Sequence, residues 1–481
     1  MKFRSIIYFI AIGMLLQAAG CKKWLDVQPK TLISEGNQFA TEAGFKDAML
    51  GVYIKLADQK TYGRNLTYGF LDVVGQCYNI ATTDATYAQA VKFNYMDQRT
   101  RQFADSIWYD MYANIGNVNQ IISNIDSSKI QFNGRMKNQI KGEALAMRAF
   151  LHFDLLRMFA PSPALNAEAK AIPYVTIFKV QVFPPLTVNQ VIDKCLTDLA
   201  QAEALLGEDK TLITAFSNLD RFSSFTRHHM NYWAVKGLQA RINLYRGDKP
   251  KALAAAMEVI NHQADNFPFV TLTAASASFN RDYTYALEHL FAVYVPNLKN
   301  LSDTYFQGSA QGAAPTFSMA DSHTKNMFET AAGGSADIRY NYLMAATGTA
   351  WATIKYSQLN IVSQAAESEY LKTLIPLIRL SELYYIAAEA SATPGDGVAF
   401  LNVIRQKRGL TALPTTQTAA NLDNELRKEI KKECYAEGQN FYYFKRKNLA
   451  KIYKVDNGQT AVTAAMYVLP IPDAEKEYGN Y

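Results

Sequence analysis

The sequence predicts a mostly α-helical protein in which paired helices form a scaffold that carries a loop-rich, irregular insertion. Apolar residues recur at steps of three or four over several long stretches, as they do on the buried face of a helix. Small residues stand at matched places across Gly/Asp turns, where they would let two antiparallel helices approach closely. Between residues 263 and 370 the helical period fades into Ser, Ala, Thr, Gly and aromatic residues.

The N-terminus has the composition of a secretion signal. Two positive charges precede an apolar run at 6–16, and small residues at 18–20 lead directly to Cys21. The run would span only about 17 Å of a hydrocarbon core roughly 30 Å thick, which disfavours a transmembrane anchor. An ordinary cleaved signal before an incidental cysteine is the alternative. The cysteine favours a signal peptide at 1–20, acylation of Cys21 and a tether at 21–31.

The composition is that of a large body in water held by this anchor. The chain has 481 residues, and its formal charge of +6 is scattered without a basic tract, so no nucleic-acid partner is expected. Beyond Cys21 there remain Cys77, Cys195 and Cys434, an odd number without metal-type spacing. We therefore expect neither a disulfide framework nor a metal or cofactor.

The first half of the chain predicts three helices. One is expected over Glu42 to Leu56, and a loop-rich segment at 58–97 follows it. A second is expected between Asp105 and Ile125, and a third from Met136 to Phe159, where two prolines then end it. Because the third helix is apolar on both flanks, it should lie between neighbouring helices.

A degenerate repeat indicates further helix pairs. Ala240 and Ala252 stand twelve residues apart across a Gly/Asp turn, and Ala387 and Ala399 repeat that spacing. This resembles the tetratricopeptide helix pair, in which small residues at matched positions bring the two helices together. With one more helix at Asn421 to Ala450, three or four pairs are expected.

These elements predict a single body at 32–481. Its helical scaffold would occupy mainly 100–262 and 371–450. The loop-rich segments at about 58–97 and 263–370 should lie on one face, because long irregular stretches in a compact protein usually build something functional.

No catalytic constellation is present in the sequence. It contains no HExxH, no GxSxG and no Walker loop, so an enzyme is not expected, and a lipoprotein hydrolase is only an alternative. Glu433 and Glu437 stand four residues apart on one predicted helix face. The basic residues around them are Arg427, Lys428, Lys431 and Lys432. Salt bridges on a partly exposed face are the expected outcome.

Aromatic and polar residues of the loop-rich segments predict a ligand surface. Sugars present flat C–H patches with hydroxyls at the rim, so exposed aromatic rings edged by Asn or Asp suit them. Peptide backbones could use the same groups. The candidate ligand-binding residues are Tyr68, Asp72, Tyr78, Asn79, Tyr87, Tyr283, Tyr305 and Trp351.

Several motifs in a fixed order resemble the SusD/RagB family, the surface lipoproteins of Bacteroidetes nutrient-uptake systems. The stretch after Cys21, Trp24-Leu25-Asp26 with Pro29, is similar to the start of family members. The scaffold motifs are Trp108 to Tyr112, Glu382 with Ala388-Glu389-Ala390, Asn402 with Ile404-Arg405, Arg408-Gly409, Glu433 with Glu437-Gly438, and Leu469-Pro470-Ile471-Pro472. Many members place Arg after the Glu-Gly pair, where this chain has Gln439, followed by Phe441-Tyr-Tyr-Phe-Lys445-Arg446.

The resemblance implies a function without chemistry. Such a protein would lie on the outer membrane, facing the cell exterior, and act as a lid on a SusC-type TonB-dependent transporter. It would capture oligosaccharides and deliver them for import. Two alternatives remain open: an oligopeptide-binding lid on the same transporter, and a tetratricopeptide-type outer-membrane assembly lipoprotein.

Overall fold

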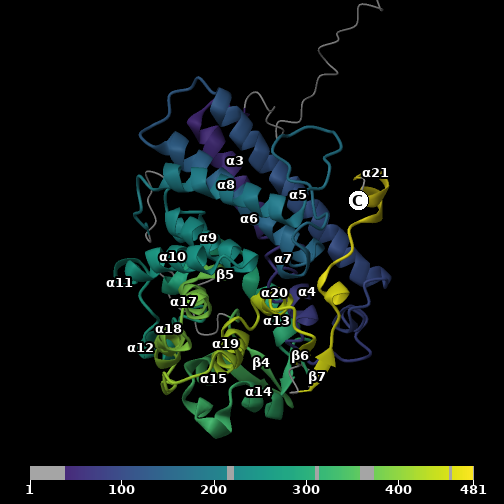
Figure 1. Cartoon of the computed structure of the whole chain (residues 1–481), viewed down its shortest axis with the longest axis vertical. Coiled ribbons are helices and arrows are strands. Elements are labelled where there is room, and N and C mark those ends of the chain that lie inside the picture. The colour runs from purple at the N-terminus through teal and green to yellow at the C-terminus, as the bar shows by residue number, and fades with distance from the viewer. Residues whose placement is uncertain (1–37, 214–221, 309–313, 358–372, 454–457, 480–481) are drawn as a thin grey trace, which may run out of the picture.

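A computed structural model describes residues 38–213, 222–308, 314–357, 373–453 and 458–479. The predicted signal peptide, Cys21 and the tether lie outside the described residues. Figure 1 shows α3 and α5 to α10 stacked in the upper part of the view, with α17 to α19 and the short strands gathered below them. Within the described ranges, none of the helices has the length and hydropathy that a membrane span requires.

The scaffold is a series of helices in which each member from α3 to α19 packs against the next, while α20 packs against α4. Its members are α3 (Glu42–Leu56), α5 (Gln98–Ser127), α6 (Met136–Phe159), α8 (Val188–Leu206), α9 (Tyr232–Arg246), α10 (Lys249–Asn261), α17 (Leu380–Ala390), α18 (Pro394–Lys407), α19 (Ala419–Glu433) and α20 (Gln439–Arg446). Short helices between them are α4 (Phe70–Val74), α7 (Pro163–Asn166) and α11 (Gln263–Asn266).

Two predicted helices, α3 and α6, have the predicted bounds. The helix α3 begins where the Thr41 hydroxyl accepts a hydrogen bond from the Gly44 N–H. The helix α6 is buried along both flanks and lies between α5 and α8, as its sequence predicts. The helix α5 is longer than predicted because the Asp97 side chain caps it by accepting from two backbone N–H groups.

The prediction of one helix over Asn421 to Ala450 is wrong, because the helix is interrupted there. The chain forms α19 and α20 with a turn between them, in which Ala436 and Gly438 have φ angles of 65° and 73°. A Cβ on Gly438 would lie 2.4 Å from the Leu66 carbonyl oxygen. The turn therefore needs glycine both for its left-handed conformation and for this close approach.

The predicted close approach of paired helices is found at the two predicted alanines in one repeat and at a different residue in the other. Ala240 of α9 and Ala252 of α10 are both fully buried. In the second pair Ala387 is buried, but Ala399 is exposed. The close contact is at Gly397 instead, where a Cβ would lie 2.5 Å from the Ala388 carbonyl oxygen.

The segment at 263–370 contains short helices and strands rather than a structureless loop. The short helices are α12 (Leu272–Ser276), α13 (Leu298–Phe306), α14 (Asp321–Met327) and α15 (Ile338–Leu343). Strand β1 (His289–Tyr294) pairs antiparallel with β5 (Leu374–Arg379), and β2 (Met319–Ala320) and β3 (Met344–Thr347) flank β4 (Ala350–Thr353). All six residues of β5 are buried, so the first of these sheets ties the insertion to the scaffold.

The C-terminal part closes the fold across the first loop segment. Strands β6 (Lys451–Tyr453) and β7 (Gln459–Ala461) form a hairpin, and α21 (Asp473–Gly479) ends the described chain. The Tyr95 hydroxyl donates to the Met466 carbonyl oxygen at 2.8 Å, and Arg101 donates to the Ile471 carbonyl oxygen at 2.9 Å.

Candidate functional site

The two loop-rich segments meet, and aromatic rings form their contact. The Asn79 N–H donates to the Ser318 carbonyl oxygen at 2.8 Å. Phe317 stacks between Tyr78 and Tyr305, with ring centroids 4.6 and 4.8 Å away. Residues more than 200 positions apart in the sequence are therefore held in one three-ring stack.

Three of the predicted platform rings are core residues. Tyr68, Tyr78 and Tyr87 are at most 3% exposed. The Tyr78 hydroxyl donates to the Tyr68 carbonyl oxygen at 2.9 Å. The expectation that they present exposed faces to a ligand is wrong, because the two loop segments cover each other and use these rings as their shared interior.

Asp72 is also a structural residue. It is fully buried, and its carboxylate accepts from the Gly438 N–H at 3.0 Å and from the Tyr78 hydroxyl at 3.2 Å. Burial raises the pKa of Asp72 to about 7, although these hydrogen bonds favour the charged form. Asp72 therefore fastens the first loop segment to the turn before α20 and cannot edge a ligand surface.

The structure separates the three aromatic candidates of the insertion. Tyr283 is buried in a small cluster with Tyr285 and Ile338, so it is no exposed platform either. Tyr305 is partly buried, and its hydroxyl accepts from Arg64 at 2.8 Å. Trp351 is partly exposed on β4.

The Trp351 ring stacks on Tyr340 at 5.6 Å and 13°. Strand β4 pairs with β2, and Trp351 lies opposite Met319 in this pairing. Met319 directly follows Ser318, whose carbonyl oxygen accepts from the Asn79 N–H. The aromatic pair Trp351–Tyr340 therefore belongs to the part of the insertion that meets the first loop segment.

A groove of about 540 Å³ lies beside this contact, and we call it the loop-junction groove. It is lined by Gln76, Tyr78, Asn79, Ile80, Val91, Lys92, Phe93, Thr460, Ala461 and Met466. Asn79 and Lys92 are exposed at its surface. The Asn79 side chain lies 3.1 Å from Nδ1 of His323 on α14, so the rim continues onto the insertion.

The groove combines hydrogen-bonding groups with apolar surface. Asn79 offers both a donor and an acceptor, and Lys92 offers an ammonium group. The Thr460 hydroxyl has no hydrogen-bond partner among the described residues. Ile80, Phe93 and Met466 supply apolar surface between these polar groups. Such a lining suits a neutral, hydroxyl-rich or amide-rich ligand.

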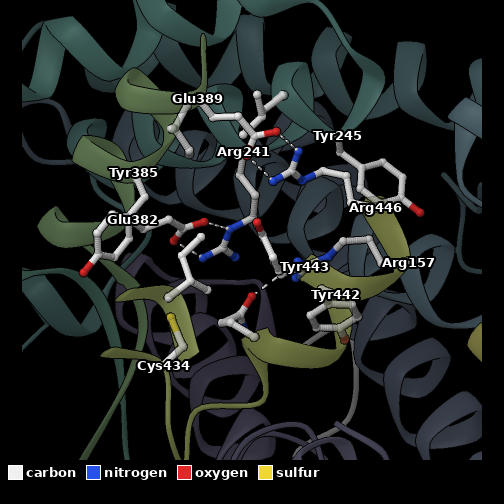
Figure 2. A pocket seen from close by; sticks show the side chains of 14 residues that line it. Arg157, Arg241, Tyr245, Glu382, Tyr385, Glu389, Cys434, Tyr442, Tyr443 and Arg446 are labelled. Carbon is white, nitrogen blue, oxygen red and sulfur yellow. Dashed lines mark hydrogen bonds and ion pairs between the residues drawn. The ribbon is translucent and has the colours of Figure 1, made fainter. Parts of the chain in front are cut away.

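A second cavity, shown in Figure 2, lies between α6, α9, α17 and α20. Its volume is only about 80 Å³. Arg241 pairs with both oxygens of Glu382 at 2.6 Å, and Arg446 pairs with Glu389 at 2.6 and 2.7 Å. Burial would raise the pKa of Glu389, but Arg446 outweighs it and holds that pKa at about 2.

The third arginine of this cavity, Arg157, lies 3.6 Å from the centroid of the Tyr442 ring and pairs with Asp154. Each of its three arginines thus already has a carboxylate partner. We interpret this cavity as a helix junction rather than a ligand site. Tyr442 and Arg446 belong to the segment in which the sequence differs from the family that it resembles, and both side chains line this junction.

Glu433 and Glu437 form salt bridges, but not on a partly exposed face as predicted. Both are at most 3% exposed. Glu433 pairs with Arg339, Arg379 and Arg408 at 2.7 to 2.9 Å. Burial would raise the pKa of Glu433, but these guanidinium groups, Arg408 first, hold it well below its usual range. The carboxylates therefore join the insertion to α19.

Sequence reasoning missed most of the groove. Gln76, Lys92, Phe93 and Thr460 come from three separate places, and no periodicity links them. Only their closeness to Asn79 in the fold identifies them. In the described part of the chain, no group of three His, Cys, Asp or Glu side chains could hold a metal ion.

Two family models match the chain. Residues 23–244 match the family described as "Starch-binding associating with outer membrane", and residues 315–475 match the SusD family. Among curated proteins, SusD-like protein P2 of Formosa agariphila is 24% identical over 96% of both chains. SusD-like protein P38 of the same organism is 22% identical over 93% of this chain and 92% of its own.

Solved structures share the fold. A SusD superfamily protein from Bacteroides thetaiotaomicron superposes with a TM-score of 0.71 at 20% identity, covering 92% of this chain and 98% of its own. A protein described as a putative sugar-binding protein from Bacteroides vulgatus has a TM-score of 0.69 at 22% identity, covering 91% and 96%. The fold is thus the helical scaffold of this superfamily. The chain belongs to the SusD/RagB family.

Proposed function

We propose that this protein is a cell-surface lipoprotein that captures oligosaccharides and delivers them to a SusC-type TonB-dependent outer-membrane transporter. The loop-junction groove carries the proposal, because it combines polar rim groups with apolar surface between the first loop segment and the C-terminal part, beside the contact of Asn79 with the insertion. The descriptions of the starch-binding family and of the sugar-binding structural relative support a carbohydrate ligand.

The proposed binding surface extends from Asn79 to the aromatic pair Trp351–Tyr340. Asn79 would hydrogen-bond to sugar hydroxyls, and the partly exposed Trp351 would contact the C–H face of a ring. The bound sugar would be released unchanged, since the protein acts by binding. The anchor would be the acylated Cys21, which would keep the body outside the cell above the transporter.

Calorimetric titration of the mature chain with oligosaccharides and with mixed peptides tests this proposal. We expect binding of oligosaccharide that falls by roughly tenfold or more in Asn79→Ala, since about 1.4 kcal/mol corresponds to a factor of ten. The matched control Asn300→Ala changes another exposed amide on α13, away from the groove lining. Heat with peptides alone would favour the oligopeptide alternative. Heat with neither class contradicts the proposal.

A further inference from the structure

A loop of unusual surface composition leaves the scaffold between α7 and α8. Its two ends are tied together, because Ala171 N–H donates to the Leu186 carbonyl oxygen at 2.8 Å and Leu186 N–H donates to that of Ile172 at 3.0 Å. An isolated bridge between Lys170 and Thr187 closes the base. The two ends of the loop are therefore held next to each other, and the residues between them project from the scaffold.

Side chains of α5 and α6 hold the first half of this loop. Asn119 donates to the Val175 carbonyl oxygen at 2.9 Å, and the Val175 N–H donates to Nε2 of His152 at 2.9 Å. The Tyr112 hydroxyl donates to the Pro173 carbonyl oxygen at 2.9 Å. Burial lowers the pKa of His152 to about 3, so the ring stays a neutral acceptor at neutral pH. The base of the loop is fixed.

The tip, residues 177–182, exposes large apolar side chains. Ile177 is 45% exposed, Phe178 and Val182 are each 59% exposed, and Val180 is fully exposed at 104%. Lys179 lies between Phe178 and Val180 and is exposed too. Several exposed large apolar side chains on one loop with a fixed base are typical of a surface that binds a partner or a membrane.

The position of the tip indicates which of these it meets. The described chain begins at Gln38, and Gln38 lines a hollow together with Asn117 of α5. Asn117 also lines the hollow of about 740 Å³ that Phe178 and Val180 line. The start of the described chain and the apolar tip thus line two hollows that share Asn117. Seventeen residue-to-residue steps lead from Cys21 to Gln38, a reach of at most about 61 Å.

We propose that the tip at 177–182 inserts into the lipid surface to which Cys21 is anchored, an inference that rests on the anchor in the proposed function. The apolar side chains would enter the boundary between headgroups and acyl chains, while the Lys179 ammonium remains among the headgroup phosphates. The body would then have two attachments, one covalent and one through the loop. Two attachments restrict how the body can turn on the membrane.

Site-specific labelling of the acylated mature chain tests the proposal. Val180→Cys can be labelled selectively with an environment-sensitive dye, because Cys77, Cys195 and Cys434 are buried. The protein is mixed with excess vesicles of phosphatidylethanolamine and phosphatidylglycerol that carry acyl-chain quenchers. We expect strong quenching at Val180 and none at the control position Phe279→Cys, which is 63% exposed on the insertion. Equal fluorescence with and without quencher at Val180 overturns the proposal.

A second measurement separates the loop from the anchor. In the mature chain with Cys21→Ser, partition onto the same vesicles should fall at least about tenfold on Phe178→Ser with Val180→Ser. The control pair Leu272→Ser with Phe279→Ser removes two other exposed apolar side chains and should leave partition unchanged. Equal partition in both pairs overturns the proposal.

The mass of the Cys21 peptide shows independently whether the proposed anchor is present. Failure of the anchor in the proposed function is therefore distinguishable from failure of the proposal for the loop tip. Unchanged melting temperatures for both pairs show that the fold is intact. Shielding of Val180 by added transporter instead of lipid assigns the tip to a protein interface and also overturns the proposal.

Discussion

The carboxylate of Asp72 accepts a hydrogen bond of 3.0 Å from the backbone N–H of Gly438, which lies 366 residues further along the chain. This bond joins the first loop segment to the turn between α19 and α20. The turn has a left-handed backbone at Gly438, and the N–H of this residue is directed at the first loop segment. A small polar contact therefore sets the position of the loop-junction groove relative to the scaffold.

The stability of Asp72→Asn relative to the natural chain should rise with pH. The pKa of about 7 in the folded state exceeds the ordinary value of 3.8, so the folded state binds more protons between these values. The natural chain therefore loses stability from about pH 4 to pH 7, while an amide cannot ionise. The relative gain should reach about 4 kcal/mol at most and then level off.

Urea unfolding at a series of pH values measures this difference. Tyr78→Phe is the matched control, because it keeps the carboxyl group and removes only a hydrogen bond that favours its charged form, so its stability should fall with pH at least as steeply as that of the natural chain. A level difference for Asp72→Asn between pH 4 and pH 8 contradicts the assignment.

Glu433→Gln should destabilise the protein by about 3–5 kcal/mol. The substitution removes one of the two carboxylates that pair with each of the buried guanidinium groups of Arg379 and Arg408, and leaves them only Glu437 and Glu288. Asp321→Asn is the control, since Asp321 pairs with Lys325 where both side chains are about half exposed, and it should cost less than about 1 kcal/mol. Denaturant midpoints compare the two. Similar small losses would show that the buried network contributes no more than a surface pair.

Gly397→Ala tests the close approach of α17 and α18. The added methyl group would meet the Ala388 carbonyl oxygen, a backbone atom that cannot rotate away, so a loss of about 1–3 kcal/mol is expected. Gly51→Ala is the matched helix position, because nothing lies within 4 Å of its Cβ, and it should stabilise α3 by about 0.5–1 kcal/mol. Thermal unfolding of both variants gives the comparison. A neutral Gly397→Ala would mean that the helices can separate freely.

The sequence was sufficient where local rules decide the structure. Apolar period and the bounding residues gave α3 and α6 with their observed ends. It was insufficient where distant contacts decide. Nothing near Glu433 indicates that Arg339 and Arg379, 94 and 54 residues earlier, are its partners.

The aromatic residues show the same limit. Tyrosine is apolar enough for a core and polar enough for a surface, so Tyr78 could suit either role. Tyr78 is buried because Phe317 and Tyr305, which are distant in the sequence, stack beside it in the fold. Asn79, the next residue, remains exposed at the groove. Neighbours in a loop thus differ in role because of what packs against the loop.

Tyr78→Ala and Trp351→Ala should separate the structural role from the proposed ligand role. Tyr78 is buried in the three-ring stack, so its loss should cost about 3–5 kcal/mol of stability. Trp351 is only partly buried, so its loss should lower the melting temperature less and weaken oligosaccharide binding more. Differential scanning calorimetry and titration calorimetry on both variants supply the two measurements. If Trp351→Ala binds oligosaccharide with the affinity and stoichiometry of the natural chain, Trp351 does not belong to the ligand surface. Asn79 and the groove would then be the remaining candidates.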